Sequence, residues 1–197
     1  GAAKTLLAET EVIRVVRGEA DRETRAWREL LDEIASRKIP QSIAAAGDEI
    51  EPAPGIRMEI LGPPKGLYDG ERTSSDNNSL VFRLSFRSAS VLFASDIRDY
   101  AEARMVKTGR DLTANVLVVA RRGGTDATTL EFLSLVKPSC CIVASGPKSI
   151  RPDADVLERL NPANTGADLY RTDTAGTVVL VTNGDSLRID AEAQGGP

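Results

Sequence analysis

The stretch Asn78-Ser79-Leu80-Val81-Phe82-Arg83-Leu84-Ser85-Phe86 repeats large apolar residues at every second position, which is the period of a β-strand. A second apolar run, 91–94, follows a turn-like segment and leads to Asp96. A third run, 116–120, leads to a charged, glycine-rich loop at 121–124. Ligands of layered α/β proteins gather at strand ends, where loops are free to vary. These two strand ends therefore form a candidate site.

Outward from this stretch, strand-like and helix-like segments alternate. Trp27, Leu30, Leu31 and Ile34 show the i, i+3, i+4, i+7 spacing of an amphipathic helix, for which Asp21 is a candidate N-cap. The residues after it, 40–55, are rich in proline and glycine and predict turns. We expect further strands at 11–17, 56–60, 140–144, 169–171, 177–182 and 186–190, a turn at 172–176, and helices at 97–108, 128–138 (with a capping box of Thr128 and Glu131) and after Pro152.

Composition is that of an ordinary globular domain. The chain has 197 residues, of which 41% are hydrophobic and 27% charged, and we expect one domain over 1–197 with a frayed end at 191–197. A net charge of −4 gives no bulk attraction to nucleic acid. No apolar run approaches the roughly 20 residues needed to cross a bilayer, so we expect a soluble domain that does not itself insert into a membrane.

Cysteine and histidine usage argues against a zinc site. Cys140 and Cys141 are adjacent, a spacing at which a disulfide strains the intervening peptide, and the chain has no histidine. We therefore expect two buried thiols in a strand, and we predict no metal and no cofactor.

Several short motifs follow one another in a specific order. They are Asn78-Ser79-Leu80-Val81, Ala94-Ser95-Asp96-Ile97, Ala101-Glu102, Ala114-Asn115-Val116-Leu117-Val118-Val119, Arg121-Arg122-Gly123, Val143-Ala144-Ser145-Gly146 and Tyr170-Arg171-Thr172-Asp173. Together these segments resemble the metallo-β-lactamase-like domain of ComEC-type DNA-uptake (competence) proteins, over roughly residues 56–185.

This resemblance implies an α/β fold with mixed sheets, the metallo-β-lactamase-like αββα sandwich, incomplete at its N-terminus. It also implies a bacterial protein with a membrane-anchored parent, and the abrupt start without methionine indicates a piece of a longer chain. Missing strands would leave a sheet edge or an apolar face uncovered. We therefore expect either a homo-oligomer that covers the gap or an unusually complete half-sandwich.

The family's metal site is where the chain departs from the pattern. Family members hold a pair of metal ions with histidines and aspartates, but here the His-His-Gly position is Arg121-Arg122-Gly123 and a later His-Pro position is Arg151-Pro152. Asp96 is the one former metal-site position that remains. Because arginine cannot bind a metal and repels one, we predict no intact metal site and no catalytic residue. Other carboxylates lack ligand spacing, namely Asp76, Asp99, Asp126 and Asp173.

Two interpretations of the arginines stay open. In the first, one arginine pairs with Asp96 and replaces the lost metal charge, since a buried carboxylate without a counter-charge is costly. In the second, the guanidinium groups and the glycine backbone bind phosphate or a nucleic-acid backbone. The candidate anion-binding residues are Arg121, Arg122, Gly123, Gly124 and Arg151.

The sequence is thus interpreted as a non-catalytic, degenerate metallo-β-lactamase-like domain of a competence-related protein. Its expected role is structural, in assembly, or in ligand binding. One alternative is a phosphate- or nucleic-acid-binding module with DNA as its partner. A second alternative is a metal-dependent hydrolase that residues upstream of this chain complete.

Overall fold

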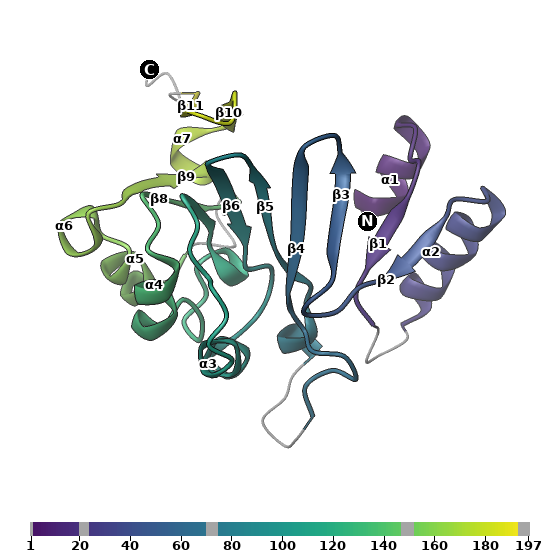
Figure 1. The fold of residues 1–197 in the computed structure, drawn as a ribbon, viewed down its shortest axis with the longest axis horizontal. Helices are drawn as coiled ribbons and strands as arrows, with labels where there is room; N and C mark the ends of the chain where they lie inside the picture. Colours follow the sequence, from purple (N-terminus) through teal and green to yellow (C-terminus); the bar gives the residue numbers. More distant parts are fainter. Residues whose placement is uncertain (1, 20–23, 70–74, 147–151, 193–197) are drawn as a thin grey trace.

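The computed structural model describes residues 2–19, 24–69, 75–146 and 152–192. At its centre is a seven-stranded sheet with the strand order β3-β4-β5-β6-β7-β8-β9 (Figure 1). Strands β3 to β6 are antiparallel to their neighbours, and β6 to β9 run parallel. The strands are Glu49–Ala53 (β3), Ile56–Gly62 (β4), Val81–Phe86 (β5), Ala89–Phe93 (β6), Val116–Val118 (β7), Cys140–Val143 (β8) and Asp168–Arg171 (β9).

Parallel strands need long crossover connections, and helices supply them here. Helix α3 joins β6 to β7, α4 joins β7 to β8, and α5 and α6 join β8 to β9. On one face of the sheet Met105, Phe132 and Val156 from these helices form a buried cluster with Leu92 and Leu117 from the strands. The helices are Asp99–Lys107 (α3), Leu130–Val136 (α4), Ala154–Arg159 (α5) and Pro162–Thr165 (α6).

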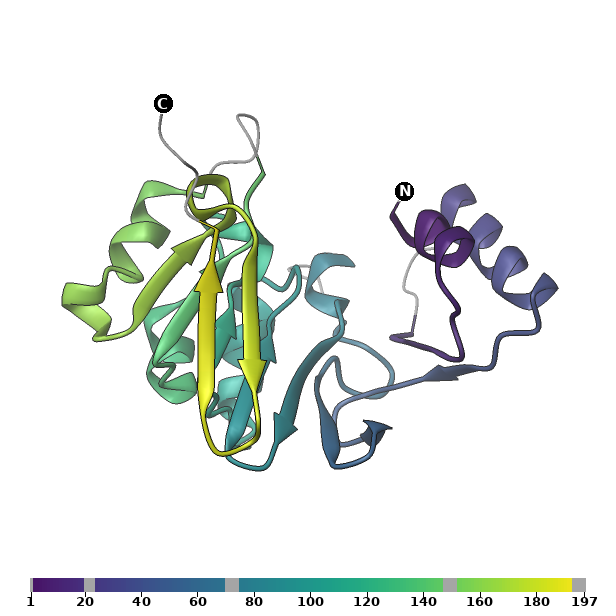
Figure 2. The same cartoon turned by 90° about the horizontal axis from the view of Figure 1, so that it is seen from above.

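The opposite face carries a hairpin of two strands, Val178–Thr182 (β10) and Leu187–Ala191 (β11). Its inward side chains pack on Val116, Cys140 and Ile142 of the central sheet. Figure 2 shows this hairpin in front of the parallel part of the sheet. It forms a second, smaller sheet layer over half of the central one.

The N-terminal residues form a separate small unit beside the sheet (Figure 2). Its two short strands pair in parallel, and α2 makes the crossover between them. The elements are Ala2–Glu9 (α1), Val15–Arg17 (β1), Arg25–Ser36 (α2) and Gln41–Ile43 (β2). Among the described residues, no helix combines the length and the apolar character needed to cross a bilayer.

The structure corrects several local predictions. Residues 40–55 are not all turns, because they contain β2 and β3, and β3 is an edge strand that gains its partner only by pairing with β4. The predicted turn at 172–176 contains a short helix, Thr172–Ala175 (α7). Strand β11 extends into the predicted frayed end, because Ala191 pairs with Val178. The predicted N-cap Asp21 lies outside the described residues, and Thr24 caps α2 by accepting from the Trp27 amide at 3.1 Å.

Candidate functional site

Four charged side chains meet at the carboxyl ends of β6 and β7. Arg98 follows β6, Arg121 and Asp126 follow β7, and Asp76 lies in the short helix Ser75–Asn78 (η1) that precedes β5. Arg98 donates to Asp76 at 2.6 Å and to Asp126 at 2.7 Å. Arg121 donates to the same Asp76 oxygen at 2.5 Å, and its Nε lies 3.0 Å from Asp126. Each carboxylate therefore contacts both guanidinium groups. We call Asp76, Arg98, Arg121 and Asp126 the four-residue ion network.

The network is half-buried and neutral as a whole, with two positive and two negative charges. Its side chains are 25% to 38% exposed. The hydrogen bond from Arg98, followed by that from Arg121, lowers the pKa of Asp76 below its usual range against the opposing effect of burial. Asp76 in turn raises the pKa of Arg98. This arrangement stabilises the ionised carboxylate and leaves little net positive charge for an anion.

The backbone that positions Arg121 is left-handed over three consecutive residues. Arg121, Arg122 and Gly123 have φ angles of 51°, 57° and 83°. This conformation is unfavourable for residues with a Cβ atom, so the surrounding structure must hold it. The Arg121 amide donates to the Ser95 carbonyl at 2.8 Å, and the Gly123 carbonyl accepts from Asp153 at 2.8 Å.

The close approach of Pro152 requires glycine at position 123. A Cβ atom at this position would lie 2.7 Å from the Cβ atom of Pro152, closer than two carbon atoms can approach. Together with its positive φ, this contact explains the glycine of the Arg-Arg-Gly motif without any ligand.

Only some of the predicted candidate residues lie at the four-residue ion network. Asp96 is exposed and makes no hydrogen bond or ion pair with the described residues. The expected pairing of an arginine with Asp96 is therefore wrong for the described arginines, since Arg121 pairs with Asp76 and Asp126 instead. Arg122 is exposed and also without a described partner. Arg151 lies outside the described residues.

Sequence reasoning missed most of the network. It offers Asp76 and Asp126 as isolated carboxylates, and Arg98 belongs to no motif. Three of the four contacts join residues 22 to 45 positions apart, so no local spacing could reveal them. The fourth joins Arg121 to Asp126 within one loop. The one usable signal was the position of Arg98 and Arg121 just beyond two strand ends.

A second polar group lies at the ends of β8 and β9. Ser145 donates to Asp173 at 2.7 Å, and Arg171 donates to both carboxylate oxygens, at 3.1 and 2.7 Å. The Arg171 hydrogen bond is the main reason why the pKa of Asp173 falls to about 2. So acidic a carboxyl group is a poor proton acceptor, and the contact is better suited to fixing the loop than to activating Ser145.

Glu102 is the most buried carboxylate of the described residues, with no exposed surface. It accepts the amides of Thr128 and Thr129 at 2.5 and 2.8 Å, just before α4 begins. The predicted capping box is thus wrong in its residues. Thr129 is the N-cap of α4, accepting from Phe132, and Glu102 from α3 supplies the carboxylate expected from the helix itself.

The residues present do not fit a pair of metal ions. Within the described part of the chain, no three His, Cys, Asp or Glu side chains are grouped as metal ligands. Asp76 and Asp126 contact guanidinium groups, which would repel a cation in the same place. No reaction step through a metal is therefore derived.

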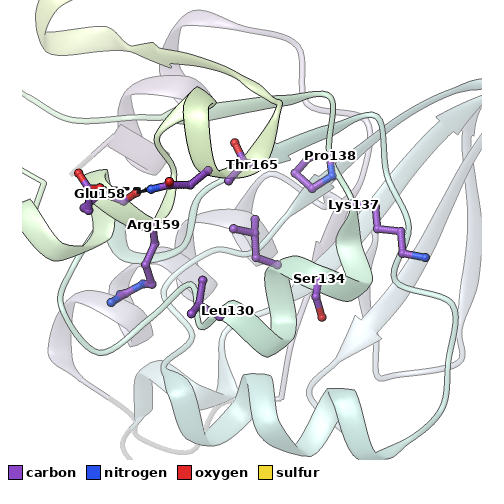
Figure 3. Close-up of a pocket in the computed structure, with 9 residues that line it drawn as sticks. Leu130, Ser134, Lys137, Pro138, Glu158, Arg159 and Thr165 are labelled. Carbon is purple, nitrogen blue, oxygen red and sulfur yellow. Dashed lines mark hydrogen bonds between the residues drawn. The ribbon is translucent and has the colours of Figure 1, made fainter.

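A cavity of about 600 Å³ lies elsewhere, between α4 and the α5–α6 pair (Figure 3). None of the candidate residues lines it. Its one arginine, Arg159, is already bound to the carbonyls of Thr128 and Ala127, at 3.1 and 3.0 Å. Size alone therefore does not make this cavity the functional site.

The mixed sheet, with helices on one face and a smaller sheet on the other, gives the chain an α/β fold with the layer order of a metallo-β-lactamase-like fold. The chain resembles the CmlA β-hydroxylase E377D mutant with a TM-score of 0.55 and 12% identity, over 80% of this chain and 38% of that one. It also resembles a metal-dependent hydrolase from Parabacteroides distasonis ATCC 8503, with a TM-score of 0.48 and 11% identity, over 81% of this chain and 76% of that one. The seven-stranded mixed sheet and the likeness with the TM-score of 0.55 confirm the expected fold class.

In sequence, the chain is similar to the competence protein ComA of Neisseria gonorrhoeae. The two are 30% identical over 129 residues, which is 63% of this chain. The same segment spans only 18% of ComA. No protein-family model matches the chain. The similarity supports the ComEC-type resemblance for this domain, and it does not extend to the rest of ComA.

Proposed function

We propose that this chain is a non-catalytic metallo-β-lactamase-like domain of a competence-related protein, with a structural or assembly role. The four-residue ion network carries the proposal. It occupies the strand ends where a site is expected, and its charges satisfy one another. The absence of histidine from the sequence and the similarity to ComA support the same reading.

The network also explains how such a domain keeps its loops in place without metal ions. Two arginines hold the loops after β6 and β7 by bridging two aspartates. Half-buried, networked ion pairs contribute more than isolated surface pairs, which are worth about 0–1 kcal/mol. The loop geometry is then a property of the chain itself.

We expect the purified chain to show no zinc- or manganese-dependent hydrolysis of a phosphodiester such as bis(p-nitrophenyl) phosphate or single-stranded DNA. We also expect either metal ion to leave its Tm unchanged, because a ligand that binds the folded state would raise it. Turnover is measured with each metal in excess, beside an Asp96→Ala variant.

Metal-dependent turnover that disappears in Asp96→Ala would overturn the proposal. Turnover seen only in a longer chain that includes the upstream sequence would favour the second alternative, a hydrolase completed by those residues.

A second candidate function is binding of phosphate or nucleic acid, and Arg122 is the observation that favours it. Unlike Arg121, it is exposed and has no described partner, beside the left-handed turn at Gly123. In this function Arg122 would contact phosphate, while Arg121 would stay bound to the aspartates.

For this candidate we expect Arg122→Ala to weaken DNA binding uniformly across sequences and to reduce the salt slope by about 1. Single- and double-stranded DNA are titrated at several salt concentrations. The matched control is Arg14→Ala, since Arg14 is also exposed but lies in the N-terminal unit. Undetectable binding at low salt, or equal weakening by both variants, would rule out a phosphate site at Arg122.

A further inference from the structure

Half of the central sheet has an apolar face that neither buried core includes. Side chains alternate along a strand, and the pairing of Leu84 with Val91 and of Val91 with Val116 places all three on one face. Val116 lies under the hairpin, but the same face continues from Phe93 at the end of β6 across β5, β4 and β3. We call the residues of this continuation the open face: Ile50, Ile56, Met58, Phe82, Leu84, Phe86 and Phe93.

The open face is apolar and partly exposed at every one of these positions. Phe82 and Phe93 stack on it with ring centroids 4.7 Å apart. None of its residues belongs to either of the two buried clusters or to the side chains packed against them. Ile60, which pairs with Phe82 on the same face, is fully buried, but the surface around it is apolar and partly exposed. Contiguous apolar surface of this kind is a candidate interaction site.

The hairpin ends at the border of the open face. Its strand β11 lies over β8 and β9, because Leu187 and Ile189 line a cavity together with Cys140 and Tyr170. Strand β10 is therefore on the other side of the hairpin, toward β5 and β6 (Figure 2). Its outer edge has no strand partner among the described residues.

On its outer side the hairpin is apolar along β10 and charged along β11, where Asp190 and Arg188 lie opposite Val179 and Val181. Val179 and Val181 of β10 point away from the core and are 46% and 45% exposed. They alternate with Val178 and Leu180, which pack inward. The same strand thus borders one uncovered apolar surface and carries another.

We propose that the open face is the docking surface for a second copy of this chain, which places the outer side of its hairpin on it. A two-fold axis parallel to β10, at the free edge of that strand, relates the two copies. The rotation turns the partner's hairpin over, so that its outer side faces the open face. The hairpin of each copy contacts the open face of the other, so the two contacts are identical and the assembly is a closed dimer.

This arrangement accounts for all three unsatisfied features. The open face is covered, Val179 and Val181 become buried, and the outer edge of β10 meets another strand edge. The two central sheets lie on opposite sides of a shared hairpin layer, so they do not compete for space. Arg188 and Asp190, paired at 3.0 Å on β11, then belong to the polar rim.

We expect the chain to sediment with twice its monomer mass of 21.1 kDa at micromolar concentration. Val181→Arg should weaken the dimer by about tenfold or more, since it puts a charge in the centre of an apolar contact. Val181 is exposed in the single chain, so this variant should fold, which circular dichroism and Tm verify. The measurement is sedimentation equilibrium over a concentration series.

The matched control is Leu130→Arg, because Leu130 is another exposed apolar residue, on the helical side of the sheet. It should leave the dimer unchanged, whereas Leu84→Arg on the open face should dissociate it as Val181→Arg does. A chain that stays monomeric at 100 µM, taken as roughly the upper limit for a weak specific dimer, would overturn the proposal. So would a dimer that Leu130→Arg breaks or Val181→Arg spares.

This inference deepens the assembly role and rests on the proposed function for its biological meaning. The two experiments fail separately. A monomeric chain without metal-dependent turnover would remove the docking surface and leave the non-catalytic domain. A dimer with metal-dependent turnover would overturn the non-catalytic proposal and leave the docking surface supported.

Discussion

Replacing Glu102 with alanine is expected to lower the free energy of unfolding by about 2–4 kcal/mol. The side chain is fully buried, and its oxygens accept the Thr128 and Thr129 amides. Alanine would leave two N–H groups without an acceptor, together with a cavity. Chemical denaturation followed by circular dichroism measures the change.

Glu102→Gln is the matched control, because it keeps the volume and one acceptor oxygen and removes the charge. Glu102→Gln should lower the free energy of unfolding by less than Glu102→Ala does. An equal loss in both variants would show that the charge, and not the acceptor, is what matters.

The comparison with glutamine also has a defined pH dependence. Burial raises the pKa of Glu102 above its ordinary value, against the lowering effect of the Thr129 and Thr128 hydrogen bonds. The folded chain therefore binds this proton more tightly than the unfolded chain does. The resulting stabilisation is present below the unfolded pKa of about 4.3 and is lost as pH rises through the folded pKa. As pH rises through the folded-state pKa of Glu102, the free energy of unfolding of the wild type should fall relative to that of Glu102→Gln.

Phe132→Ala is expected to cost about 3–5 kcal/mol of stability, the usual range for a buried aromatic residue. Phe132 is fully buried between α4 and the central sheet, in the larger core cluster. The truncation removes a large apolar contact and leaves a cavity that a closely packed core fills poorly. Thermal and urea unfolding measure it.

Leu130→Ala tests whether that loss comes from burial. Leu130 lies on the same helix but is 66% exposed, so its truncation should change stability by less than about 0.5 kcal/mol. Comparable losses at the two positions would contradict the assigned face of α4.

Periodicity predicted the regular elements near the middle of the chain correctly. Alternation at Phe82 and Leu84 predicted β5, and the apolar runs at 91–94 and 116–120 predicted two neighbouring strands that do pair in parallel. Both signals are local, because the apolar residues of a strand or helix recur along the sequence with the period of that element. The edge strand β3, whose prolines and exposed residues carry no such period, was not predicted.

The sequence predicted where the candidate site lies, but it did not predict which side chains contact one another there. Arg121 does lie at a polar cluster beyond a strand end, but its partners are Asp76 and Asp126, and Asp96 is not one of them. The order of motifs fixes which loops meet. It does not fix which side chains within them come within hydrogen-bond distance, since that depends on backbone turns such as the left-handed one at Arg121.

The sequence by itself determined the period of the central strands and helices, the mixed α/β class, and the fact that no histidine is available as a ligand or base in this chain. Only the tertiary structure decided that Arg98 and Arg121 share two aspartates and that Glu102 accepts the amide of Thr129, the N-cap of α4, 27 residues away. It also decided that half of one sheet face lies outside both core clusters of the described residues. The reason is physical. Secondary structure depends on neighbours along the chain, whereas ion pairs, caps and covered faces depend on which distant segments the fold brings within a few ångströms.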